Sequence, residues 1–128
     1  MSKAKKAYKK VREAYLAGKL GAQNSNGCVY HQPAGNKRVE RFCAVGCLLS
    51  EKQLEQIKAA RLNTNAEIDR VICKIGDLGL GLDRAQLGEM QFHHDATVGD
   101  DPDEAKKLRA GDKDTSFYRF LKQAIETA

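Results

Sequence analysis

Long hydrophobic runs are absent from this 128-residue sequence, and their absence excludes membrane-spanning proteins. No apolar stretch approaches the roughly 20 residues that a membrane-spanning helix needs. The first residues lead into a lysine-rich segment rather than into the apolar stretch of a secretion signal. We therefore expect a soluble, cytoplasmic protein with no membrane partner.

Tryptophan is absent, and the chain has only two prolines and eleven glycines. This composition excludes collagen-like and low-complexity chains, and 41% hydrophobic residues suit one compact domain with a single core. A chain of this length buries roughly two-thirds of its unfolded surface, so it needs no disulfides to fold. We expect residues 1–128 to form a single domain.

Several catalytic motifs are also missing. The sequence has no paired carboxylates for acid–base work and no serine nucleophile motif. The glycines at 76, 79 and 81 match neither the Walker pattern nor the dinucleotide-binding pattern, and helix termination explains them better. No motif therefore identifies an enzyme activity.

The spacing of apolar residues predicts a mainly α (α+β) fold, with about five helices around one small antiparallel β-hairpin. Serine and aspartate caps fix several of the helix starts. The expected organisation is a basic amphipathic helix within 1–20, a hairpin over 28–42, a helical core over 43–96, a polar loop over 97–114 and a C-terminal helix over 115–128.

Within these segments the helices are expected as follows. The basic helix covers 4–17, and a short buried helix over 42–49 follows the hairpin directly. Within the polar loop, we expect at most one exposed helical turn, around 104–108. Further helices are expected at about 51–60 after Ser50, after a cap at Thr64 or Asn65, at about 84–96 after Asp83, and from Ser116 onward.

The positive charge is confined to one end of the chain. The formal net charge is +5, and the first 20 residues hold seven lysines and arginines against Glu13 alone, so the other 108 residues sum to −1. Clustered cations attract phosphate and release its counterions, which favours a contact with nucleic acid or an acidic host protein. The alternative is a solvated helix face that only aids solubility. The candidate contact residues are Lys5, Lys6, Lys9, Lys10 and Arg12.

Three of the four cysteines fall within twenty residues, in a chain whose thiols the cytosol would keep reduced. The spacing Cys28-x2-His31 followed by Cys43-x3-Cys47 suits a structural zinc site, because residues four apart on a helix have β-carbons about 5–6 Å apart. The simplest alternative is that these thiols are only buried, and Cys73 is expected to be unrelated. The candidate zinc ligands are Cys28, Cys43, Cys47 and His94, with His31 as an alternative ligand.

A cysteine-dependent enzyme is the other alternative for this cluster. Cys43 would be the nucleophile, favoured as a thiolate at the start of a helix, and His94 would be its base. Asp95 follows His94 directly and is expected to project elsewhere on its helix, so the sequence identifies no third member of a triad.

The segments 28–31, 41–49 and 90–95 contain a C-x-Y, a C-A-V-G-x-L and an H-D motif. In these motifs the chain resembles a group of small, uncharacterised bacteriophage and prophage proteins. The resemblance implies a phage origin and a protein that acts inside an infected bacterium, and it supplies no activity. Small phage proteins without catalytic motifs commonly act by binding. The expected function is therefore that of a non-enzymatic binding protein, such as a counter-defence or host-takeover inhibitor, directed at a host protein, nucleic acid or small ligand. The matching positions are Cys28, Tyr30, Cys43, Gly46, Cys47, His94 and Asp95.

Overall fold

The computed structural model describes residues 1–24, 27–64 and 66–128, and this part of the chain is mostly helical. The predicted fold class is confirmed: helices surround small antiparallel hairpins in one domain. None of the helices described is long and apolar enough to cross a membrane. The elements are α1 (Lys3–Leu16), β1 (Gln23–Asn24), β2 (Gly27–Cys28), β3 (His31–Gln32), β4 (Arg41–Phe42), the 3-10 helix η1 (Gly46–Leu48), α2 (Glu51–Ala59), α3 (Ile68–Ile75), α4 (Arg84–Asp100), α5 (Pro102–Arg109) and α6 (Ser116–Thr127).

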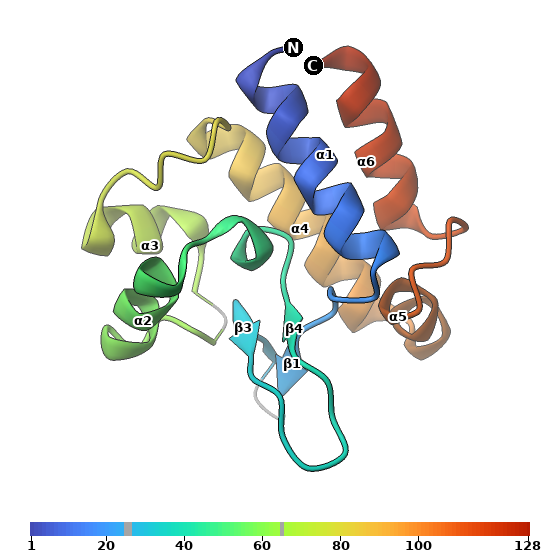
Figure 1. Ribbon diagram of the computed structural model, residues 1–128, viewed down its shortest axis with the longest axis horizontal. Helices are drawn as coiled ribbons and strands as arrows, with labels where there is room; N and C mark the ends of the chain where they lie inside the picture. Colours follow the sequence, from blue (N-terminus) through green and yellow to red (C-terminus); the bar gives the residue numbers. More distant parts are fainter. Residues whose placement is uncertain (25–26, 65) are drawn as a thin grey trace.

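The core lies between α1, α4 and α6, which run alongside one another (Figure 1). Tyr15 of α1 is fully buried, and its ring packs against Phe117 of α6 with centroids 6.0 Å apart. Its hydroxyl also meets the Thr115 hydroxyl at 2.6 Å and donates to the Asp112 carbonyl. The two ends of the chain are thereby joined, and both termini lie at the same end of the molecule (Figure 1).

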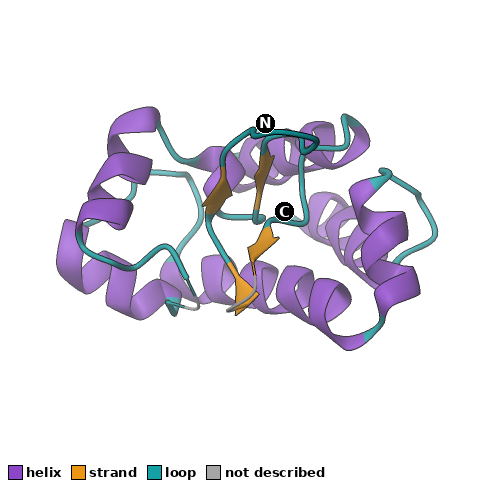
Figure 2. Ribbon diagram, turned by 90° about the horizontal axis from the view of Figure 1, so that it is seen from below, coloured by secondary structure: helices purple, strands orange, loops and turns teal. Residues whose placement is uncertain are grey.

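The β region consists of two small antiparallel sheets in the middle of the molecule, with helices around them (Figure 2). The predicted hairpin over 28–42 is confirmed in its outer part, where β3 pairs with β4 and His31 lies opposite Phe42. Its expected start differs, because β2 turns away and pairs with β1. The Tyr30 amide, between β2 and β3, donates to the Asn63 carbonyl at 3.0 Å and so interrupts the strand.

The buried segment after the hairpin is shorter and tighter than the predicted helix over 42–49. Residues 44 and 45 form a turn, and the 3-10 helix η1 follows directly. Its main chain packs directly on Tyr30, whose carbonyl accepts the Cys43 amide at 3.2 Å. A β-carbon on Gly46 would lie 2.0 Å from that carbonyl oxygen, so the close approach requires glycine.

Capping explains where the middle helices begin. Ser50 forms the expected capping box at the start of α2, and Asp83 caps α4 as expected, where Gln86 completes a second capping box. The third helix is different: α3 has Glu67 as its N-cap, whereas Thr64 pairs with Val29 in an isolated β-bridge. The alternative cap, Asn65, lies outside the residues described.

The predicted polar loop over 97–114 is wrong. Helix α4 continues to Asp100, and α5 follows after a single residue. Asp101 caps α5 by accepting the Asp103 amide at 2.9 Å, and Pro102 occupies the first turn, where its missing N–H costs nothing. The helix buries Ala105 and Leu108, so the segment is part of the core rather than an exposed turn.

We predict that Gly46→Ala lowers the free energy of unfolding by about 1–3 kcal/mol, because the new methyl group overlaps the Tyr30 carbonyl. Urea denaturation measures the change. The matched control is Gly99→Ala in α4, where no heavy atom lies within 4 Å, and a gain of up to about 1 kcal/mol is expected there. Equal effects of the two substitutions would contradict the close packing of η1.

Candidate functional site

Cys43 follows β4 and has no exposed surface. Its sulfur accepts the Gly46 amide at 3.1 Å. Burial raises the pKa of the Cys43 thiol well above its ordinary value, and the negative charge of Asp95 raises it further. The thiol form is therefore favoured at neutral pH, which is the opposite of what a cysteine nucleophile needs.

Cys28 and Cys47, the other two cysteines of the cluster, also have raised pKa values. Burial raises the pKa of Cys28 to about 12, and the neighbouring Asp95 carboxylate contributes to the rise. Burial also raises the pKa of Cys47 to about 12, and its S–H donates to the Ala44 carbonyl at 3.1 Å. Cys73 lies exposed on α3, and the sequence-based expectation that it is unrelated agrees with this placement.

His94 of α4 is fully buried, and both of its ring nitrogens have partners. The Gly21 amide donates to Nε2 at 3.2 Å, so Nε2 carries no proton. The proton is therefore on Nδ1, which donates to Asp95 Oδ1 at 2.9 Å. Gln91, one turn earlier, donates to both oxygens of the same carboxylate at 3.1 and 3.3 Å.

The Asp95 contact corrects the sequence analysis, which placed this carboxylate elsewhere on the helix. Its short side chain turns back to the preceding imidazole because Gln91 holds it there. A histidine–aspartate pair thus exists, but the lone pair of Nε2 is used by Gly21. His94 consequently has no free nitrogen with which to take a proton from Cys43, and the geometry gives the cysteine-enzyme hypothesis no support.

The zinc hypothesis finds no support in the geometry either. Within residues 1–24, 27–64 and 66–128, no three histidine, cysteine or acidic side chains are grouped as a metal site requires. The alternative ligand His31 is also occupied. Its Nε2 donates to Glu40 at 2.7 Å, its Nδ1 accepts from the Lys58 ammonium at 2.5 Å, and its ring stacks on Phe42.

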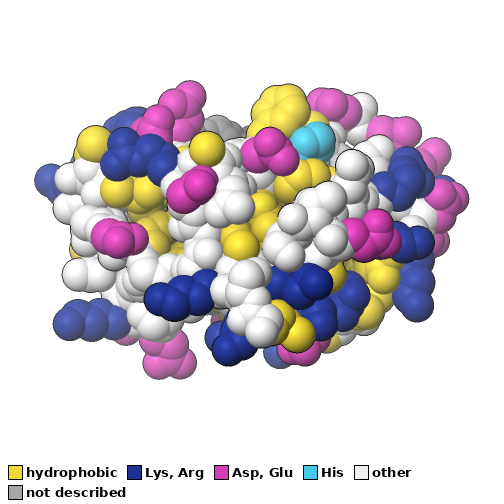
Figure 3. All heavy atoms as spheres, turned by 90° about the horizontal axis from the view of Figure 1, so that it is seen from above, with side chains coloured by type: hydrophobic (Ala, Val, Ile, Leu, Met, Phe, Trp, Pro, Cys, Tyr) yellow, Lys and Arg dark blue, Asp and Glu magenta, His cyan; other side chains and the backbone are white. Residues whose placement is uncertain are grey.

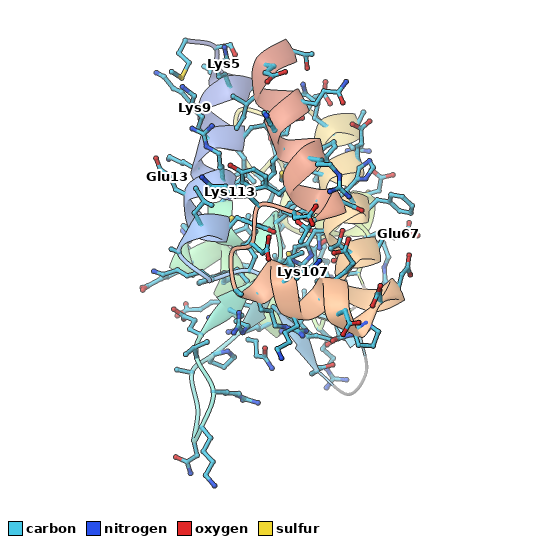
Figure 4. The ribbon with its side chains drawn as sticks, turned by 90° about the vertical axis from the view of Figure 1, so that its right-hand side faces the viewer. Lys5, Lys9, Glu13, Glu67, Lys107 and Lys113 are labelled. Atoms are coloured by element: carbon cyan, nitrogen blue, oxygen red, sulfur yellow. The ribbon has the colours of Figure 1, made fainter. Side chains whose placement is uncertain are left out.

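The cations of α1 form two rows along the helix. Lys6 and Lys10, with Lys3, line a surface groove of about 460 Å³. Lys5 and Lys9 form the second row, which continues into Glu13 (Figure 4). Arg12, the remaining candidate, is half-buried one turn after Lys9.

The opposite wall of this groove is the loop Gly79–Gly81 together with Leu48, residues that the sequence did not identify as functional. Gly81 has φ +86°, and a β-carbon there would lie 2.9 Å from the Lys3 carbonyl oxygen. Glycine therefore allows the loop to lie directly on the start of α1. The cluster of glycines was the available signal, but as a sequence pattern it indicates only helix termination.

Comparison with models of known protein families found no match, and neither did the searches of the curated proteins and of the solved structures. The resemblance to small phage proteins stays a prediction. The site is interpreted below from its own geometry.

We predict that Cys73 alone reacts quickly when the native protein is treated with iodoacetamide at neutral pH. Cys73 is exposed, whereas burial disfavours the thiolates of the other three cysteines. Intact-mass spectrometry counts the adducts, and Cys73→Ser should remove the fast one. Unfolded protein, in which all four thiols react, is the control. Rapid modification of Cys43 in the native protein would instead support the cysteine-enzyme hypothesis.

We also predict that His94→Leu lowers the free energy of unfolding by about 1–3 kcal/mol, because the Gly21 amide loses its acceptor in a buried position. The control is His93→Leu, which removes the ring stacked on Phe120 but keeps the Gly21 contact. A loss of about 0.5–1.5 kcal/mol is expected for the control. Chemical denaturation compares the two, and a larger loss for His93→Leu would contradict the role assigned to His94.

Proposed function

We propose that this chain is a non-enzymatic binding protein that holds nucleic acid against α1 and the groove beside it. The observation that carries the proposal is the groove itself. Three lysines line it, and none of its lining residues is acidic, although the chain outside the first 20 residues is close to neutral. A concave surface with one sign of charge concentrates a polyanion.

The lysines of α1 form no ion pair with a carboxylate of the described chain, so their charges can interact with a partner. In the described part of the chain, the ion pairs involve cations of the hairpin, α4, α5 and α6, and none involves a cation of α1. The face at which the two termini lie shows several lysine and arginine side chains gathered along one edge (Figure 3). A phosphate chain bound there would meet ammonium groups that no carboxylate already neutralises.

The chemistry of the groove favours contact with phosphates rather than bases. Lysine contributes a point charge without the planar fork that arginine uses to read guanine. The remaining lining residues are Ala7, Leu48, Gly79, Leu80 and Gly81, so the groove offers no aromatic ring for base stacking. Binding should therefore be independent of sequence and strongly dependent on salt.

The biological setting belongs to the same proposal. If the resemblance to phage proteins holds, the nucleic acid would be bound inside an infected bacterium, as a counter-defence or host-takeover activity. An acidic host protein is the second kind of partner that a basic helix fits, and the experiment below separates the two. The zinc module and the cysteine enzyme are not favoured by any observation described above.

The test is a fluorescence-anisotropy titration of labelled DNA duplexes at several salt concentrations. Two unrelated sequences should bind equally well, because phosphates carry the interaction. The double variant Lys6→Gln, Lys10→Gln should weaken binding and reduce the slope of log K against log salt by about 0.9 for each lysine lost.

Two matched double variants serve as controls. Lys5→Gln, Lys9→Gln removes the same charge from the other row and should weaken binding less, because Glu13 continues that row. Lys52→Gln, Lys74→Gln removes two positive charges from exposed positions on α2 and α3 and should weaken DNA binding least. An unchanged salt slope for Lys6→Gln, Lys10→Gln would reject the proposal, and absence of DNA binding by the unaltered chain would favour an acidic protein partner.

A further inference from the structure

A second groove, with the opposite charge, lies between the start of α3 and the middle of α4. Its volume is about 600 Å³. Small residues keep it open, since neither Gly88 nor Ala96 carries a side chain large enough to fill it. The apolar lining residues are Ala66, Ile68, Gly88, Phe92 and Ala96.

Phe92 is the most unusual of these residues. Its side chain is 68% exposed, although α4 otherwise buries its large apolar side chains Leu87, Met90 and Val98. The ring touches His93 edge-on, with centroids 5.7 Å apart. Exposed aromatic rings of this size are enriched where proteins bind partners, because they supply contact area at a low cost in conformational entropy.

Apart from Gln91, the polar part of the lining is acidic, although Gln91 and His94 already donate hydrogen bonds to one of its carboxylates, Asp95. Glu67, Asp69, Asp95 and Asp100 contribute carboxylates, and neither lysine nor arginine is among the lining residues. Arg84 reaches Asp69 from outside the groove at 3.4 Å, and both of these side chains are well exposed, so this ion pair neutralises little of the charge. Glu67 makes no capping bond with its side chain at the start of α3, which leaves its carboxylate available.

We propose that this groove binds a cationic segment of a partner protein, in which arginine or lysine alternates with apolar side chains. The apolar side chains would enter the lining between α3 and α4, and the cations would meet the carboxylates and the face of the Phe92 ring. A free cation would use only the carboxylates and leave the apolar lining uncovered. The charge and the apolar surface together therefore select a peptide.

This surface is separate from the proposed nucleic-acid surface. In Figure 4 the labelled Lys5 and Lys9 of α1 lie along one edge of the molecule, and Glu67 lies at the opposite edge. Four carboxylates repel a phosphate chain, so the nucleic acid of the proposed function does not fit here. The two proposals can therefore fail independently.

The test measures binding of a short fluorescein-labelled peptide of alternating arginine and leucine to the full chain by fluorescence anisotropy. Phe92→Ala should weaken binding about threefold, because it removes a cation–π contact at an exposed site. Glu67→Gln, Asp100→Asn should weaken it about fivefold, because it removes two of the four carboxylates. Both variants change exposed side chains, and circular dichroism verifies that they fold.

Matched controls test whether the loss of peptide binding is specific to this groove. Val39→Ala removes another exposed apolar side chain, and Glu55→Gln, Glu126→Gln removes two exposed carboxylates outside the groove, so both should bind the peptide as the unaltered chain does. A peptide with glutamate in place of arginine should not bind. Equal losses in the controls, or equal binding of the glutamate peptide, would overturn the proposal. Salt-sensitive dimerisation of the chain that Lys6→Gln, Lys10→Gln abolishes would overturn it too, in favour of a second copy as the occupant.

Discussion

The hydrogen bond from the Gly21 amide to the buried His94 ring holds the small β region on the helical bundle. Gly21 is fixed on both sides, because the Arg109 guanidinium of α5 donates to its carbonyl at 3.0 Å. Its φ of +91° and the closeness of the Arg109 side chain, 2.6 Å from a β-carbon placed there, both require glycine. The segment between α1 and β1 is thereby attached to α4 and α5, and the strands and η1 are built onto that attachment.

The same contacts explain why thiols beside a histidine and an aspartate do not have the arrangement of a catalytic triad here. The imidazole of His94 orients Asp95, and Asp95 in turn raises the pKa of Cys28 and Cys43, in addition to the larger effect of burial. In a catalytic triad the same residue types would lower the pKa of a thiol and leave a nitrogen free to accept its proton. Here the polar groups satisfy one another within the protein, which is the arrangement of a structural network.

The surface carries two grooves of opposite charge. The groove beside α1 presents lysines against a glycine loop, and the groove beside α3 presents carboxylates around an exposed phenylalanine. Under the two proposals, one small protein would hold a polyanion on one face and a cationic protein segment on another, and so would bring two partners together.

The sequence by itself determined the elements whose signals are local. The amphipathic spacing of α1, the caps at Ser50 and Asp83 and the apolar face of α6 needed only neighbouring residues, and each was predicted. The helix α5 was predicted only as one exposed turn in a loop, although Asp101 and Pro102 signal its start, because its polar composition concealed the burial of Ala105 and Leu108. Only the tertiary structure decided the turn of Asp95 toward His94, the contact of the glycine loop with α1 and the groove around Phe92. Each of these depends on contacts between segments distant in the chain or on the orientation of one side chain. The spacing of residues along the sequence predicts neither the contacts nor the orientation.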